Sequence, residues 1–221
     1  MPISALTDFD PPPSPGSMGT SGNDTLHGGA GTETIDGLGG IDTIIFSGNR
    51  AGYTLSHNTD GSYAVTDNTG AGGTDTLLNI ERIQFADKKL AFDLDGGAGA
   101  TAKLIAAAFG MSSLTPDLVS QGISLFDAGY TLDTLSQPVI NTGLFQGMAG
   151  SSSNTAFVTL VYHNVMGTTN ASEAGDIAYF VSLLDQHVLT QAELLVKAAN
   201  CAENIQHVNL VGLAATGLEY T

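Results

Sequence analysis

The sequence has few basic residues, a single cysteine and no tryptophan. Six Lys and Arg residues stand against 22 Asp and Glu residues, which gives a formal net charge of −16. Such a chain lacks the positive surface that nucleic acids and anionic membranes require, so we expect neither as a partner, whereas binding of cations is favoured. The lone Cys201 excludes an internal disulfide, and its apolar surroundings indicate a buried structural thiol.

Long apolar runs and catalytic signatures are also missing. No stretch approaches the roughly 18–20 consecutive apolar residues of a transmembrane helix, so we expect no membrane span. The motifs G-x-S-x-G and H-E-x-x-H are absent, and no two of the histidines are spaced i, i+4. We therefore expect a non-enzymatic protein, and a small extracellular enzyme with an unrecognised site is the alternative.

Residues 1–18 contain neither the basic start nor the apolar core of a secretory signal peptide. Five prolines lie within residues 2–15, which predicts an extended, disordered arm over 1–18. The chain as a whole is 42% hydrophobic and contains 28 glycines. It can therefore bury a core, and it should be rich in turns.

A repeat of nine residues dominates the stretch that follows. Three consecutive units read GTSGNDTLH (19–27), GGAGTETID (28–36) and GLGGIDTII (37–45). Glycine occupies the first and fourth position of every unit. The sixth position is acidic (Asp24, Glu33, Asp42) and the eighth is apolar (Leu26, Ile35, Ile44).

This spacing suits a calcium site. Glycines allow positive φ angles in tight turns, so that backbone carbonyls can point at one spot, and the acid of the sixth position adds charge. Calcium is a hard cation that takes about six to eight oxygen ligands. The predicted ligand residues are Asp24, Asp42, Glu33, Asp75, Gly19, Ser21, Gly22, Gly37, Gly39 and Gly40. A glycine-rich linker that contains acids by chance is the alternative, which the shared register of three units disfavours.

The repeat also predicts how the acids pair. The last three residues of each unit should form a short strand with its apolar side chain pointing inward, and two units should make one coil of a parallel β-roll. Asp24 and Asp42 are 18 residues apart and should stack in one complete site. Glu33 should lie on the opposite side without a partner one coil later, because residues 46–54 break the pattern. We therefore expect Asp24→Ala and Asp42→Ala to weaken calcium binding far more than Glu33→Ala.

The three units resemble the RTX (repeats-in-toxin, haemolysin-type) family of calcium-binding secreted proteins. The resemblance implies Ca²⁺ as the ligand and a location outside a Gram-negative bacterium, either secreted or at the cell surface. It also implies export by type I secretion machinery, which reads an uncleaved signal at the C-terminus. Calcium would then act as a folding switch, with the roll loose inside the cell and folded outside.

Two hairpins are predicted after the repeats. The first spans residues 52–68 and turns at Asp60-Gly61. Residues 70–78 then match the nonapeptide again, with Asp75 in the sixth position, so the hairpin should be an insertion between turns of the roll. Asp75 could lie in a plain β-turn or in a second metal-binding turn. The second hairpin spans residues 79–95 and should cap the open end of the roll.

From residue 101 to residue 221 the pattern becomes helical, after a predicted hinge at 96–100. Thr115 before Pro116, and Thr190 with Glu193 three residues later, predict the starts of two of the helices. Its two halves echo each other at an offset of 57 to 59 residues, which predicts an internal duplication. This region resembles a helical domain of unknown function found in bacterial secreted and surface-layer proteins, on the basis of Tyr162, Gly167, Gly175, Tyr179 and Phe180. Residues 168–171 depart from that family's pattern.

The predicted fold class is therefore α+β: a 19–95 calcium-binding roll with hairpins, and an all-helical domain. The predicted function is that of a non-enzymatic secreted protein whose roll folds on binding extracellular calcium. A surface-layer or adhesion component is the other alternative, with the helical domain binding copies of itself or cell-surface glycan.

Overall fold

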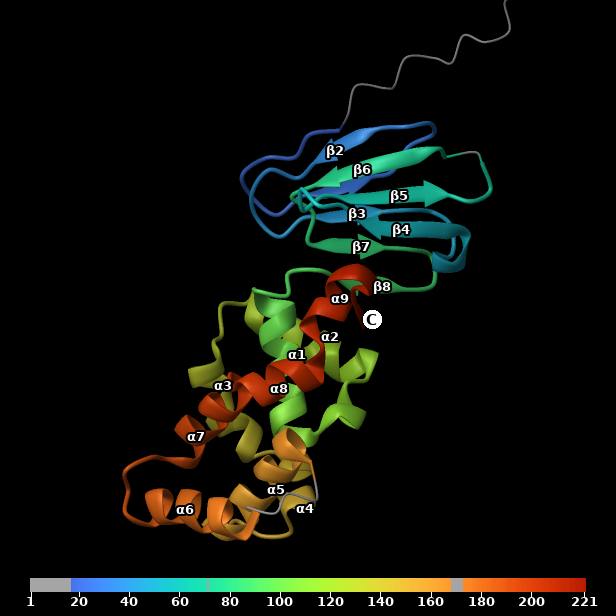
Figure 1. The fold of residues 1–221 in the computed structure, drawn as a ribbon. Coiled ribbons are helices and arrows are strands. Elements are labelled where there is room, and N and C mark those ends of the chain that lie inside the picture. Colours follow the sequence, from blue (N-terminus) through green and yellow to red (C-terminus); the bar gives the residue numbers. More distant parts are fainter. Residues whose placement is uncertain (1–16, 71, 168–172) are drawn as a thin grey trace, which may run out of the picture. The chain divides into compact units, whose positions relative to one another are not determined.

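The computed structural model describes residues 17–70, 72–167 and 173–221 (Figure 1). Most of the predicted arm, and the departure at 168–171, lie outside these residues. The fold is mixed α+β as predicted, with strands first and helices after them. The chain divides into two compact units after Leu90, and each is described by itself.

The first unit contains a β-roll. The strands of this part of the chain are β1 (Thr25–His27), β2 (Thr34–Asp36), β3 (Thr43–Ile45), β4 (Tyr53–His57), β5 (Tyr63–Asp67), β6 (Thr74–Leu78), β7 (Arg82–Gln84) and β8 (Lys89–Ala91). β1, β3 and β7 run parallel side by side, and β8 follows β7 in that sheet. In the other sheet β2 and β6 are parallel, and β6, β5 and β4 are antiparallel. We use the term roll for β1, β2, β3, β6 and β7 with their connecting turns.

The apolar eighth positions fill the interior of the roll. Ile44 pairs with Ile83 in one sheet and Ile35 pairs with Leu77 in the other. All four side chains are at most 1% exposed. Strands of three residues are too short to be stable alone, so this shared core and the parallel register must hold the coils together.

The hairpin β4–β5 is an insertion, as predicted. It lies between β3 and β6, and the chain then returns to the roll with β6 beside β2. Residues 79–81 connect β6 to β7, and β7 pairs with β3 in the first sheet. The predicted arm ends earlier than expected, because Met18 bridges to Asp36 and the Ser17 carbonyl accepts a hydrogen bond from Asp36 N. Residues 17 and 18 thus belong to the first coil.

The second unit is helical. It comprises α1 (Gly97–Phe109), α2 (Pro116–Asp127), α3 (Leu132–Ile140), α4 (Gly143–Ala149), α5 (Asn154–Met166), α6 (Glu173–Asp185), α7 (Gln191–Ala199), α8 (Ala202–Val208), α9 (Leu210–Thr216) and the short β9 (Leu218–Tyr220). Thr115 and Thr190 cap the N-termini of α2 and α7 through their side chains, as their spacing predicts. The alanine-rich α1 is buried along most of its length and packs against α2, α5 and α7.

The element lengths support the predicted duplication. α1 and α5 each have 13 residues and end at a glycine with positive φ, Gly110 and Gly167. α3 and α7 each have nine residues, and α4 and α8 each have seven. The four helices of the first half thus recur in order in the second.

The predicted hinge at 96–100 is wrong, because α1 already begins at Gly97. The Asp93 carboxylate accepts a hydrogen bond from Ala98 N at 3.0 Å and so caps the first turn of the helix. A β-carbon at Gly99 would collide with the backbone of Leu94. The glycines of this stretch therefore permit close packing at a helix start rather than bending between two parts.

Candidate metal centre

The acids of the sixth positions form two stacked rows, one on each side of the roll. We call Asp24, Asp42 and Glu81 the first ladder, and Glu33 and Asp75 the second ladder. In the first ladder, Asp42 Oδ1 accepts a hydrogen bond from Asp24 N at 2.7 Å. Glu81 Oε2 in turn accepts one from Asp42 N at 2.8 Å. Each carboxylate therefore lies against the backbone of the acid one coil away, which confirms the predicted stacking of Asp24 on Asp42.

Asp42 is the most enclosed member of the first ladder. Its side chain is fully buried, and Oδ2 has no hydrogen-bond partner among the described residues. Burial raises the pKa of Asp42, and the nearby charges of Asp24 and Asp36 raise it further. Burial likewise raises the pKa of Glu81, with a smaller contribution from the charge of Asp42. A buried carboxylate oxygen without a partner is costly unless a proton or a cation satisfies it.

Glycine turns bring backbone carbonyls to the same ladder. A β-carbon added at Gly19 would lie 2.5 Å from the carbonyl oxygen of Gly37 and 2.9 Å from Asp24 Oδ2. One added at Gly37 would collide with both the Asn79 carbonyl oxygen and Asp42 Oδ2. Only glycine fits at these two positions, because carbonyl and carboxylate oxygens crowd against their α-carbons.

The rest of the two turns is stacked in the same way. Gly39 N donates a hydrogen bond to the Thr20 carbonyl at 3.2 Å. Gly40 has a φ angle of 125°, and a β-carbon there would lie 2.6 Å from the carbonyl carbon of Gly22. Ser21 lies opposite Gly39. The structure therefore brings together all the turn residues predicted as ligands: Gly19, Ser21, Gly22, Gly37, Gly39 and Gly40.

The second ladder corrects the prediction that Glu33 lacks a partner. Asp75 Oδ1 accepts a hydrogen bond from Glu33 N at 3.0 Å, across 42 residues of sequence. Glu33 itself accepts a hydrogen bond from Gly29 N. The hairpin β4–β5 loops out of the roll and returns the chain in register, so that the unit at 70–78 replaces the missing coil. Asp75 thus lies in a repeat turn of the roll and not in an isolated β-turn.

Asp75 is also strongly perturbed. It is 2% exposed, and burial raises its pKa to about 6, with the charge of Glu33 acting in the same direction. It lines a hollow of about 400 Å³ together with Asp67 and residues 28–30. The second ladder therefore combines an enclosed carboxylate with open space beside it.

Glu81 was missed by sequence reasoning, although a signal for it exists. The sixth to eighth positions read DTL, ETI, DTI and DTL in the repeats that contain Asp24, Glu33, Asp42 and Asp75, and residues 81–83 read ERI. The glycines that mark the other units are absent before Glu81. The acid-x-apolar pattern directly after the unit at 70–78 is the signal for this third rung.

The residues present fit a calcium ion. Within the ranges that the structure describes, no group of three or more Asp, Glu, His or Cys side chains converges on one point. Backbone carbonyls would therefore have to complete a coordination shell of six or more oxygens. The crowding of the Gly37 and Asn79 carbonyls beside the carboxylates of Asp24 and Asp42 supplies such oxygens.

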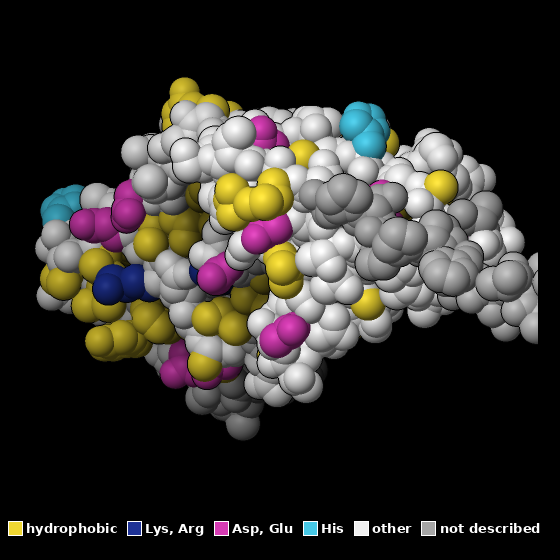
Figure 2. Space-filling model, turned by 90° about the horizontal axis from the view of Figure 1, so that it is seen from above, with side chains coloured by type: hydrophobic (Ala, Val, Ile, Leu, Met, Phe, Trp, Pro, Cys, Tyr) yellow, Lys and Arg dark blue, Asp and Glu magenta, His cyan; other side chains and the backbone are white. Residues whose placement is uncertain are grey.

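The wider surface favours cations too. Figure 2 shows acidic side chains in magenta scattered over the visible face, whereas Lys and Arg side chains take up little of it. This agrees with the net charge of −16. A negative surface raises the local concentration of cations and speeds their association.

Residues 18–44 match a family model that is described as "RTX calcium-binding nonapeptide repeat (4 copies)". The match covers the turns that carry Asp24, Glu33 and Asp42. It confirms the predicted repeats, which bind calcium ions and are typical of secreted bacterial proteins. No curated protein sequence matches the chain. The resemblance of the helical half to a domain of surface-layer proteins stays a prediction.

No helix in the described part of the chain is long and apolar enough to cross a membrane.

The stacking of Glu33 on Asp75 changes the expected ranking of the acid variants. We now expect Glu33→Ala and Asp24→Ala to cause comparable losses of calcium binding, because each removes one rung of a two-sided roll. Isothermal titration calorimetry on the full chain measures both losses. Asp117→Ala in the exposed first turn of α2 is the control for the removal of one negative charge. A loss for Asp24→Ala with none for Glu33→Ala would show that the second ladder does not bind calcium.

Proposed function

We propose that this chain is a non-enzymatic secreted protein whose roll folds on binding extracellular calcium. The observation that carries the proposal is the fully buried Asp42, whose Oδ2 lacks a partner among the described residues and lies among stacked glycine turns. The carboxylates of Asp24 and Asp42, with carbonyls of the turns at 19–22 and 37–40, would hold the ion. Calcium supplies the positive charge that these buried oxygens require.

The same geometry explains why the roll would stay open inside a cell. Two like charges about 4 Å apart repel by roughly 4 kcal/mol at the effective dielectric of a protein surface. Calcium-free coils must bring their acids together against such repulsion. Extracellular calcium sites bind at dissociation constants of roughly 10⁻⁴–10⁻³ M, well above cytosolic calcium levels. The roll would therefore fold after export rather than before it.

Calorimetric titration of the full chain with calcium and then with magnesium tests this function. We expect calcium to bind in the range of roughly 10⁻⁴–10⁻³ M, and magnesium to bind far more weakly, because magnesium gives up its waters reluctantly and demands octahedral geometry. A chelator should reverse the calcium signal. Equal heats for the two ions, or no saturable calcium binding, would refute the proposal.

We further propose export by a type I secretion system, with the signal in residues 160–221. This part contributes buried side chains to the helical core, among them Val161, Leu195 and Leu218, so its deletion would also unfold that unit. A sharper test than deletion is to express the full chain in a Gram-negative host with and without a type I transporter and to measure its release into the medium. Fusion of residues 160–221 to an unfolded passenger then tests sufficiency. Two results would contradict this route: release of the full chain from the host that lacks the transporter, or retention of the fusion in the host that has it.

A further inference from the structure

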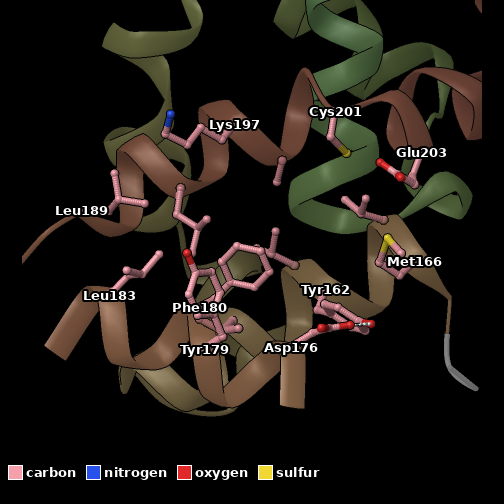
Figure 3. Close-up of a pocket in the computed structure, with 15 residues that line it drawn as sticks. Tyr162, Met166, Asp176, Tyr179, Phe180, Leu183, Leu189, Lys197, Cys201 and Glu203 are labelled. Atoms are coloured by element: carbon pink, nitrogen blue, oxygen red, sulfur yellow. Dashed lines mark hydrogen bonds between the residues drawn. The ribbon is translucent and has the colours of Figure 1, made fainter. Parts of the chain in front are cut away.

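The helical unit contains a pocket that the calcium-binding role does not use. It has a volume of about 570 Å³ and lies among α5, α6 and α7 (Figure 3). Small-molecule sites are typically about 300–1,000 Å³ and mostly apolar, with a few polar groups that fix orientation. The volume of the pocket falls within this range.

The pocket exists because α6 packs less closely than its counterpart in the first half. α2 buries Val119 and Ile123 against the core. The residues in the same place in α6 are Ile177 and Val181, which are only partly buried. Of the whole of α6 only Leu184 is fully buried. α6 thus packs less closely than α2, which has the equivalent place in the first half, and space is left beside α6.

Apolar and aromatic side chains form most of the wall. α5 contributes Val158, Val161 and Val165, and α6 contributes Tyr179, Phe180 and Leu183. The rings of Tyr179 and Phe180 are 5.4 Å apart in an edge-to-face arrangement, and Tyr179 is 60% exposed. A flat or elongated apolar group would bury these surfaces, and aromatic faces also attract cations.

Two of the three charged residues of the lining are acidic. Asp176 on α6 accepts a hydrogen bond from the buried Tyr162 hydroxyl at 2.8 Å. Glu203 on α8 lines the pocket as well, beside Cys201. The single basic residue of the lining is Lys197, which Figure 3 shows on the other side of the pocket from Asp176 and Glu203. One part of the pocket is therefore negative, and its Asp176 carboxylate is held in place by Tyr162.

We propose that this pocket binds a small molecule with an apolar or aromatic body and a positively charged amine. The apolar walls would take the body, and the carboxylates of Asp176 and Glu203 would lie near the amine. The net charge of −16 acts in the same sense, since it attracts cations and repels anions at long range. The site is independent of the roll, so its failure would leave the calcium proposal untouched.

Three probes of the same shape test the charge preference. Phenylbutylamine, phenylbutanol and phenylbutanoate share one body and differ in the head group. We expect the amine to bind the full chain roughly fivefold more tightly than the alcohol, as for a solvent-accessible ion pair, and the carboxylate to bind most weakly. Amide chemical shifts in α5, α6 and α7 locate the binding and give the dissociation constants.

Variants separate the body site from the charge site. Asp176→Asn and Glu203→Gln should bring the amine to the affinity of the alcohol, whereas Asp117→Asn, outside the pocket, should not. Ala198→Phe places a ring in the pocket and should abolish binding of all three probes. If that variant fails to fold, the two charge variants still decide the matter. Equal affinity of the three probes, a preference for the carboxylate, or no binding by any of them would overturn the proposal.

Discussion

Asp42→Asn is expected to remove the stabilisation of the roll by calcium and, at neutral pH without calcium, to make the roll more stable than the wild type. The asparagine oxygen can still accept the hydrogen bond from Asp24 N that Asp42 Oδ1 accepts. The amide nitrogen replaces Oδ2, the buried oxygen without a partner, and we expect it to donate a hydrogen bond to the Asn79 carbonyl, since a β-carbon at Gly37 would collide with both oxygens. A buried polar atom left unsatisfied costs about 1–3 kcal/mol, which sets the expected gain.

The fraction of folded roll, read from the amide signals of β2, β3 and β6 with and without calcium, measures this effect, and urea titration measures it wherever the folded roll is populated. Asp24→Asn is the matched control. Its carboxylate is less buried and already accepts hydrogen bonds from Thr20, so its calcium-free form should gain less. If calcium stabilised Asp42→Asn as much as the wild type, Asp42 would not be a ligand. If the calcium-free variant were less stable than the wild type, burial of the Asp42 charge would not destabilise the calcium-free roll as we assign.

The second large effect concerns pH. In the absence of calcium, the roll should lose stability as the pH rises from about 4 through about 6. Burial raises the pKa of folded Asp75 to about 6, against 3.8 for an aspartate in the unfolded chain. A raised pKa in the folded state means that stability is fully present below the unfolded value and is lost as the pH rises through the folded value. The shift of about two units corresponds to about 3 kcal/mol. The raised pKa values of Asp42 and Glu81 act in the same direction.

Calcium should invert this dependence, because it binds the deprotonated carboxylates. The fraction of folded roll at about pH 5 and about pH 7.5, with and without calcium and read from the strand amide signals, measures both dependences. Without calcium the roll should be more stable at the lower pH, and with saturating calcium at the higher pH. Asp75→Asn should flatten the calcium-free slope. A calcium-free roll that is most stable at the higher pH would contradict the assigned burial of Asp75.

The sequence predicted the roll because local chemistry determines it. The glycine and acid spacing of residues 19–45 implies turns and inward-facing apolar residues at fixed intervals, and Ile35 and Ile44 are indeed fully buried. The partner of Glu33 could not be found in this way. Its position depends on how far the hairpin β4–β5 leads the chain away and where it returns, which is a property of the folded sheet.

The helical unit shows the same limit. The capping threonines 115 and 190 marked helix starts correctly, because a cap is a local interaction. The glycines at 96–99 suggested a hinge, whereas Gly99 is required because a β-carbon there would collide with the backbone of Leu94. The pocket beside α6 likewise depends on how three helices pack, and no sequence pattern marks it.

Amide hydrogen exchange on the full chain, with and without calcium, tests the central claim most directly, because it reports the roll and the helices separately. Without calcium we predict fast exchange for the amides of β1, β2, β3 and β7, and protection in buried helices such as α1 and α5. Millimolar calcium should protect the strand amides, among them those of Thr43 and Thr76 that donate across coils, and a chelator should reverse this. Strand amides that are equally protected without calcium would contradict the account.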